Sequence, residues 1–371
     1  MSLTFGVEEE FLVVDPTGHL SGQGPTVVEE AEEVEGELQK ELNQCQVEAA
    51  TGICTTPDQL LTQLRDLRDK LATSAADRGL RLIPSAAPIL AEDGPPEITP
   101  NLRYAKMAAH FGATARMATT CGCHVHIAIP DRETGVRLSN HLRPWLPLLL
   151  TLTANSPFDD GQDTGYCSWR YQQWSRWPSA GPPPYFDSPD HYDQTVQAML
   201  DSGAMLDRGM VYWDMRLSEN QPTLEFRIGD VAATAEEATL FAVVIRGLAS
   251  TAMEAIGDGK AAPQLPSELL RANLWRASRD GMAGKTLHPV TGRLTPVAEQ
   301  WDDLVALISP ALAREPGDGE FVEAGLASLR ENGGGAQRQR NAFHRRHDLR
   351  DVLDVLAVNP GNTPAALGRP A

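Results

Sequence analysis

The sequence has little positive charge, and this shortage excludes whole classes of partner. Across 371 residues, 32 Lys and Arg stand against 50 Asp and Glu, which gives a formal net charge of −18. Such an excess of negative charge repels phosphate backbones and acidic lipid surfaces, and the one basic stretch, residues 338–350, is short. We therefore expect no nucleic-acid partner and no membrane partner.

The sequence also lacks a paired cysteine framework and a long apolar run. Its five cysteines are scattered, with no CxxC pair, and they predict free thiols in a reducing compartment. The most apolar window, residues 145–152, is too short to span a bilayer, and no basic segment followed by an apolar run opens the chain. We expect a cytoplasmic protein that is neither exported nor membrane-inserted.

Strand-like and helix-like segments are interspersed along the chain, which predicts a mixed α and β protein. A helix is expected after Thr56, because Thr56 and Gln59 form a capping box and Pro57 suits the first helical position. Strands are expected over residues 3–14, 42–50, 122–129, 210–217 and 223–229. Further helices are expected over residues 103–117, 235–255, 267–279, 296–307 and 337–357.

Two segments differ from this pattern. Residues 158–186 are rich in aromatic residues and proline, and we expect a long ordered loop that either binds a ligand or packs on the core. Residues 361–371, rich in Pro and Ala, are expected to form a flexible tail. Residues 1–360 are then expected to form a single domain.

Three of the expected strands have one apolar face and one charged face, because side chains alternate between faces along a strand. The charged faces carry Glu8 and Glu10, His124 and His126, and Glu225 and Arg227. Glu9 is the exception, since it falls on an apolar face. For any one strand, a solvated face of an antiparallel sheet is the simpler explanation. If the three faces belong to one sheet, they form a charged site.

Two details favour a cation at such a site. A His-x-His pair is unusual for plain solvent exposure, and a Glu-x-Glu pair places like charges together unless a cation lies between them. Carboxylate-rich sites suit Mg²⁺ or Mn²⁺, whereas zinc prefers His and Cys. Metal ions beside an arginine also suit ATP, because they neutralise the phosphates while the arginine stabilises the transferring phosphoryl group.

Five motifs stand in order along the chain, followed by GGGAQRQR at residues 333–340. They are GVEEEF (6–11), the stretch from Glu41 through Glu48 to Gly52, CHVH (123–126), the loop with SWR (168–170) and RWP (176–178), and TLEFR (223–227). In this order and spacing the chain resembles the carboxylate-amine ligase family, also called type 2 glutamate–cysteine ligases.

The resemblance implies an α+β fold shared with glutamine synthetase and the guanidino kinases. Such a fold has a curved, mostly antiparallel sheet that forms a half-barrel, with helices on its outer face and with ATP and divalent cations on its concave face. The implied reaction uses ATP to phosphorylate the γ-carboxylate of L-glutamate. The amine of L-cysteine then displaces phosphate, giving γ-glutamylcysteine and ADP.

The resemblance also implies roles for residues. The metal ligands would be Glu8, Glu10, Glu48, His124 and Glu225. Arg227 would lie at the transferring phosphate, and Arg170 would hold a substrate carboxylate, with Trp169 and Arg176 in the same substrate-binding loop.

Four further assignments leave alternatives open. Glu41 resembles another metal ligand, but in an unbroken strand it would face away from Glu48, so it needs a bulge or a loop. His126 either contacts metal or nucleotide or merely lines the site. Arg338 and Arg340 either close over phosphate or form surface ion pairs.

Other functions stay open as well. Proteins of this kind are often poor at joining glutamate to cysteine, so a ligase for another acid and amine is the nearest alternative. A zinc hydrolase built on His124 and His126 is disfavoured by the number of carboxylates. A third class is a non-catalytic nucleotide-binding protein. A homodimer is the default expectation for oligomeric state.

Overall fold

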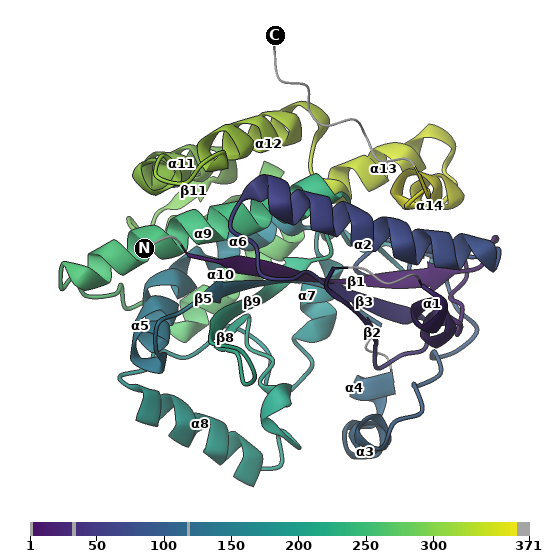
Figure 1. Cartoon of the computed structure of the whole chain (residues 1–371), viewed down its shortest axis with the longest axis horizontal. Helices are drawn as coiled ribbons and strands as arrows, with labels where there is room; N and C mark the ends of the chain where they lie inside the picture. Colours follow the sequence, from purple (N-terminus) through teal and green to yellow (C-terminus); the bar gives the residue numbers. More distant parts are fainter. Residues whose placement is uncertain (1–2, 32–34, 117–118, 362–371) are drawn as a thin grey trace.

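The computed structural model describes residues 3–31, 35–116 and 119–361. Within these residues, one antiparallel sheet has the strand order β2-β3-β1-β5-β9-β8, and β4 pairs with the end of β1. The strands are β1 (Phe5–Val14), β2 (Glu37–Lys40), β3 (Gln46–Ala50), β4 (Arg81–Ile83), β5 (Gly122–Ala128), β8 (Met215–Leu217) and β9 (Thr223–Asp230). In the described residues the edge strands β2 and β8 do not pair, so the twisted sheet stays open (Figure 1). The predicted α+β fold with a mostly antiparallel, unclosed sheet is confirmed.

Two long helices, α2 (Pro57–Asp77) and α9 (Ala235–Gly257), cover one face of the sheet (Figure 1). The start of α2 follows the predicted signals. The Thr56 hydroxyl accepts a hydrogen bond from the Gln59 backbone N–H at 3.2 Å, and Pro57 occupies the first turn. The apolar residues of α2 and of the inner strand faces are buried together, so the core lies between this helix layer and the sheet.

Helix α9 is long and apolar enough to cross a membrane, by length and composition alone. Of its most apolar window, 67% is buried inside the protein. The sheet lies on one side of α9, and α11 (Val297–Leu312) and α12 (Asp318–Asn332) lie on the other (Figure 1). Burial between these layers accounts for the apolar composition of α9 as that of a core helix.

The remaining elements surround this frame. The helices are α1 (Gly24–Glu30), α3 (Leu102–Phe111), α4 (Ala113–Arg116), α5 (Arg132–Leu142), α6 (Leu146–Thr153), α7 (Trp169–Trp174), α8 (Pro189–Asp201), α10 (Ser267–Asp280), α13 (Gly335–Arg346) and α14 (Arg350–Leu356). Short 3-10 helices cover Arg143–Trp145, Arg208–Met210 and Gly281–Ala283, and two hairpins pair β6 (Phe158–Asp159) with β7 (Gln162–Asp163) and β10 (Lys285–Leu287) with β11 (Leu294–Pro296).

Four predicted segments are wrong in detail. The strand expected over residues 210–217 is confined to β8, because its first residue belongs to the 3-10 helix Arg208–Met210 and residues 211–214 form a connection. The strand expected over residues 42–50 is confined to β3, because residues 41–45 form the connection from β2. The segment 158–186 is not one loop, since it contains the β6–β7 hairpin and α7. The helix expected over residues 337–357 is two helices, because His347 adopts a left-handed conformation (φ 54°) that ends α13.

Two other expected segments extend beyond the described residues. The helix expected over residues 103–117 breaks at Gly112 (φ 57°) into α3 and α4, and Met117 lies outside the described residues. Most of the expected tail, residues 362–371, also lies outside them. The assignment of residues 1–360 to one domain stays a prediction.

Candidate active site

The charged faces of three neighbouring strands lie side by side, as parity predicted. Along the first half of β1, residues alternate between buried and half-buried, and the two half-buried glutamates, Glu8 and Glu10, face away from α2. Cross-strand neighbours on that face are Glu8 with His124, Glu10 with Glu48, and His126 with Glu225. The sheet therefore collects acidic and imidazole side chains from β1, β3, β5 and β9 on one surface.

Glu9, the exception in the parity pattern, points to the opposite face and is buried. Arg68 of α2 meets it there: its Nε donates to Glu9 Oε2 at 2.8 Å and its Nη2 to Glu9 Oε1 at 2.5 Å. A buried charge of this kind is tolerated when it is paired and hydrogen-bonded. Glu9 therefore fastens α2 to the sheet and takes no part in the charged surface.

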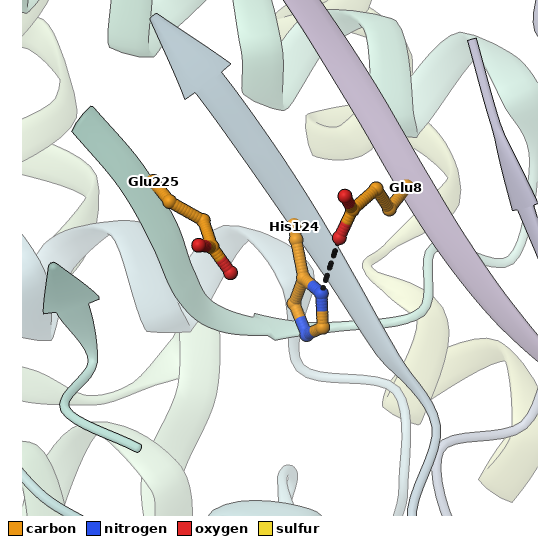
Figure 2. A group of neighbouring side chains, drawn as sticks. All are labelled: Glu8, His124 and Glu225. Carbon is orange, nitrogen blue, oxygen red and sulfur yellow. Dashed lines mark hydrogen bonds and ion pairs between the residues drawn. The ribbon is translucent and has the colours of Figure 1, made fainter. Parts of the chain in front are cut away.

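Two groups of side chains on this surface have the composition of a divalent-metal site. Figure 2 shows the first, in which Glu8, His124 and Glu225 point toward one another from three adjacent strands. In this group the possible ligand atoms lie within 4.8 Å of one another, and the same holds for Glu10, Glu48 and His124. His124 is common to both groups.

The hydrogen bonding of His124 fits a metal ligand. Its Nδ1 lies 3.1 Å from Glu8 Oε2 (Figure 2). Its Nε2 is buried, has no hydrogen-bond partner among the described residues, and lies 4.0 Å from Glu10 Oε1. A buried nitrogen without a partner is costly unless something else satisfies it. Because burial lowers the pKa of His124, the ring is favoured in the neutral form that binds metals.

The carboxylates of the surface differ widely in acidity. Burial, reinforced by the charges of Glu41 and Glu8, raises the pKa of Glu48 well above its usual value. Burial and the charge of Glu10 raise the pKa of Glu41 to about 7. Burial also tends to raise the pKa of Glu8. Hydrogen bonds with His124 and His126 outweigh this effect and hold the pKa of Glu8 below its usual range. A bound cation would relieve the repulsion among these acids.

Glu41 reaches this surface because the chain leaves β2 at Lys40 and re-enters the sheet at Gln46. In an unbroken strand Glu41 would lie on the opposite face from Glu48. Because residues 41–45 form a loop, this alternation does not apply to Glu41. Its side chain hydrogen-bonds Glu48 and borders the same cavity. The structure thus supplies the loop that the sequence interpretation required.

Two arginines hold Glu225. Arg216 of β8 donates from Nε to Glu225 Oε2 at 2.7 Å and from Nη2 to Oε1 at 3.1 Å, and Arg227 forms a further ion pair with Oε1. Although burial acts against the charged form, the charges of Arg227 and Arg216 lower the pKa of Glu225 to about 2. Glu225 is therefore a fixed carboxylate at neutral pH.

Arg170 of α7 is buried next to the second metal-type group. Its Nη2 donates to the Arg227 carbonyl oxygen at 3.3 Å. Arg170 can occupy this place only because residue 122 is glycine. A Cβ at residue 122 would overlap Arg170 Nη2 and would lie 2.8 Å from His124 Nε2. The absence of a side chain at Gly122 therefore lets Arg170 and His124 approach the same point of β5.

His126 lies at the edge of the surface. Its Nε2 is 3.2 Å from Glu8 Oε1, and its Nδ1 is 2.9 Å from the Thr223 hydroxyl. Burial opposes protonation, but the hydrogen bond with Glu8 and the charges of Glu225 and Glu8 together outweigh it and raise the pKa of His126. His126 and His124 thus contact different oxygens of the Glu8 carboxylate.

A cavity of about 230 Å³ opens over the charged surface. One wall is acidic and the other is largely aromatic. Sequence reasoning missed several lining residues, namely Gln46, Arg103, Tyr104, Met107, Thr120, Trp174, Trp177, Tyr212 and Arg216. Three of them had a usable signal. Trp174 and Trp177 belong to the aromatic-rich segment 158–186, and Arg216 alternates with apolar Met215 and Leu217 as Glu225 does with its own neighbours.

A bulge in β9 adds one more acid to this face. The register slips between Cys123 and Val125, so that Gly122 pairs with Asp230. Asp230 then accepts hydrogen bonds from the Ser168 hydroxyl at 2.7 Å and the Ser156 hydroxyl at 2.8 Å. Because Ser168 caps α7, this contact fixes the helix that carries Arg170.

Comparison with known protein families agrees with the resemblance found in the sequence. The model of the family described as glutamate-cysteine ligase family 2 matches residues 4–354. The chain belongs to glutamate–cysteine ligase family 2.

Relatives in this family are similar along the full chain. A protein of Rhodococcus jostii (strain RHA1), named "Putative glutamate–cysteine ligase 2-1", is 52% identical over 355 residues and covers 95% of both chains. A protein of the same name from Nocardia farcinica (strain IFM 10152) is 47% identical, covering 96% of this chain and 92% of its own.

Solved structures share the fold at low identity. Glutamate–cysteine ligase from Francisella tularensis, in complex with AMP, superposes with a TM-score of 0.72 at 12% identity, covering 96% of this chain and 88% of that one. A bifunctional glutathione synthetase from Pasteurella multocida gives 0.67 at 16% identity, covering 96% of this chain and 51% of that one.

Seven residues that were assigned to the site from the sequence do not border the cavity: His126, Trp169, Arg170, Arg176, Glu225, Arg338 and Arg340. Three of them, His126, Arg170 and Glu225, contact residues that do line it. The other four lie elsewhere. Trp169 donates from Nε1 to Asp159 at 2.8 Å, and Arg176 is exposed. Arg338 pairs with Glu237 at 2.6 Å, and Arg340 pairs with Asp163 at 2.7 Å. In this conformation the last two arginines are salt-bridge partners, the alternative given for them above.

Proposed function

We propose that the chain is an ATP-dependent carboxylate-amine ligase that forms an amide through an acyl phosphate. The observation that carries this is the pair of carboxylate–imidazole groups on one sheet face with Arg227 beside them. Membership of glutamate–cysteine ligase family 2 and the names of its relatives support L-glutamate, L-cysteine and ATP as the leading substrates. The products would be γ-glutamylcysteine, ADP and phosphate.

Mg²⁺ or Mn²⁺ is proposed as the cation, because the donor set is mostly carboxylate oxygen with one shared imidazole. Glu8, His124 and Glu225 would hold one ion, and Glu10 and Glu48 with the same His124 a second, with Glu41 near the second group. When bound, such ions would neutralise the phosphates of ATP and orient its terminal phosphoryl group.

Two arginines are proposed for the transferred charge. Arg227 borders the cavity beside Glu225, where it would stabilise charge on the phosphoryl oxygens in transfer. Arg170 lies next to His124 with a planar fork of N–H donors, which suits a substrate carboxylate. The aromatic wall, with Tyr104 and Trp177, would shield the reacting groups from water.

The activation has a clear chemical reason. A carboxylate does not react with an amine at neutral pH, because its oxygen is a poor leaving group. Phosphorylation converts that oxygen to a good leaving group, so one difficult step becomes two easier ones. The amine then displaces phosphate, and amide and inorganic phosphate are formed in equal amounts.

Cellular context completes the proposal. All five cysteines are free thiols, four of them buried, which suits the reducing cytoplasm. Small-molecule amino acids and ATP are the proposed partners, and the homodimer stays a prediction.

The test is release of ADP and phosphate by the purified protein with Mg²⁺ across a panel of acids and amines. We expect release that requires an acid and an amine together, with glutamate and cysteine tried first. Release with another pair would keep the reaction and change the substrates. Binding of ATP without acid- and amine-dependent release would favour a non-catalytic nucleotide-binding protein.

A further inference from the structure

Trp174, which the family resemblance did not assign, contacts two buried arginines of the site. It is the last residue of α7, a helix on the opposite side of the sheet from α2 and α9 (Figure 1). The guanidinium carbon of Arg170 lies 5.6 Å from the centre of the Trp174 ring, and that of Arg227 lies 5.9 Å from it. Both distances fall within the range of about 6 Å for a cation–π contact.

Hydrogen bonds alone do not fix these two guanidinium groups. The Nε atoms of Arg170 and Arg227 are both buried and have no hydrogen-bond partner among the described residues. The two side chains also carry like charges in one buried region, where their repulsion is poorly screened. An aromatic ring within cation–π distance of both guanidinium groups offsets part of this repulsion.

The Trp174 ring is itself held in place. Its Nε1 donates to the Tyr212 carbonyl oxygen at 3.3 Å, and its ring centre lies 4.7 Å from that of Tyr212. Tyr212 contacts Arg227 as well, also at 5.9 Å, whereas among the described residues Trp174 is the ring in contact with both arginines. Trp174 therefore couples the two cations to one rigid support.

We infer that Trp174 is a positioning residue that orients Arg170 and Arg227 together, so that their N–H groups meet the acid substrate as its carboxylate becomes an acyl phosphate. This inference rests on the proposed function, since the anion it names is the substrate of that reaction. Trp174 acts through the arginines and touches no reacting atom. Loss of its ring would loosen both donors without removing either charge.

The test compares Trp174→Leu, which removes the aromatic face, with Trp174→Phe, which keeps a smaller one. Trp275→Leu is the matched control, because Trp275 is half-exposed and lies outside the cavity, and its indole N–H donates a hydrogen bond to the Tyr166 hydroxyl. Kinetic constants for acid and amine are measured for each protein. Arg side-chain ¹⁵N spectra, assigned with Arg170→Lys and Arg227→Lys, report the ring contact without any substrate.

For Trp174→Leu we expect the KM for the acid to rise about tenfold, with a smaller change for the amine, and Trp174→Phe to recover most of the loss. Both arginine Nε–H signals should move in Trp174→Leu and stay nearly in place in Trp174→Phe. Unmoved signals in Trp174→Leu, kinetics equal to those of Trp275→Leu, or equal damage in both Trp174 variants would overturn the inference.

The kinetic and the spectroscopic measurements also distinguish failure of this inference from failure of the proposed function. A wild-type protein without acid- and amine-dependent ADP release would refute the ligase assignment. In that case the ¹⁵N spectra would still decide whether Trp174 orients the two guanidinium groups.

Discussion

The imidazole of His124 lies 3.1 Å from the carboxylate of Glu8, across the pairing of β5 with β1. The other ring nitrogen is directed toward the acids of the second group, 4.0 Å from Glu10. One side chain thus joins the two metal-type groups, and the predictions below follow from what surrounds it.

Metal binding should stabilise the folded protein, because ions that bind only the folded state raise its melting temperature. In Glu48→Gln we expect a clearly smaller rise with Mg²⁺, since one ligand oxygen is weakened. Without metal, its melting temperature should equal or exceed that of wild type, because a buried repulsion is removed. Glu299→Gln, on the exposed side of α11, is the control. An unchanged Mg²⁺ response in Glu48→Gln would exclude Glu48 from the metal site.

Glu225 should behave differently from Glu10 when either is replaced by Ala. Both changes should abolish Mg²⁺-dependent activity, because each deletes an oxygen ligand. Only Glu225→Ala should also lower stability strongly, since it leaves Arg216 and Arg227 without their shared carboxylate. Turnover and thermal unfolding of the two variants measure this. If Glu10→Ala kept most of its turnover at saturating Mg²⁺, the assignment of this face would be wrong.

The buried pair of Arg68 and Glu9 should contribute to stability and not to catalysis. Arg68→Met leaves an unpaired buried carboxylate and should cost about 3–5 kcal/mol in urea unfolding. The double variant Glu9→Leu with Arg68→Met should recover most of that loss. Arg78→Met, which breaks the more exposed pair with Glu30, should cost about 1 kcal/mol or less. A small effect of Arg68→Met would contradict the structural role of this pair.

Asp214 should make stability depend on pH. It is buried and accepts a hydrogen bond from the Tyr171 hydroxyl at 3.2 Å, and burial raises its pKa to about 7. An aspartate in the unfolded chain has a pKa of about 3.9, so between about pH 4 and 7 the folded state retains a proton that the unfolded state has lost. Stability from this group is therefore greatest at low pH and falls as the pH rises through that window.

Asp214→Asn removes this dependence while it keeps an acceptor for Tyr171. The variant and wild type should be about equally stable near pH 4, and the variant should be the more stable by up to roughly 4 kcal/mol above pH 7. Urea unfolding across this range measures the difference. A constant difference at all pH values would show that Asp214 is already ionised in the folded protein.

Parity along β1, β5 and β9 predicted most of the charged surface, because alternation depends only on local strand geometry. Strand alternation alone was enough to place Glu8, Glu10, His124 and Glu225 on the charged faces. Glu9 looked anomalous only because its partner, Arg68, comes from a helix far along the chain. The sequence pattern contains no sign of that contact.

The rest of the site depends on features that a strand pattern does not encode. The loop that brings in Glu41 interrupts what looked like one strand, and the bulge in β9 turns Asp230 onto the site face. Trp174 and Tyr212 border the cavity through tertiary packing of α7 and a loop. Their aromatic character was visible in the sequence, but their position beside Arg227 was not.

Arg170→Lys should impair use of the acid more than binding of ATP, because lysine keeps the charge but loses the planar fork that pairs with a carboxylate. We expect the KM for the acid to rise about tenfold or more, corresponding to about 1.4 kcal/mol, and the KM for ATP to change little. Arg279→Lys, on an exposed face of α10, should match wild type. Equal damage to the use of both substrates, or none, would assign Arg170 a structural role.

The central claim is the acyl phosphate, and an oxygen label tests it most directly. An acid substrate whose carboxylate carries ¹⁸O is turned over with ATP and amine, and the released products are analysed by mass spectrometry. If the carboxylate attacks the terminal phosphoryl group beside Arg227, one labelled oxygen passes into inorganic phosphate and ADP is formed. Label in AMP, with pyrophosphate as the other product, would show adenylation and contradict the mechanism even if an amide were made.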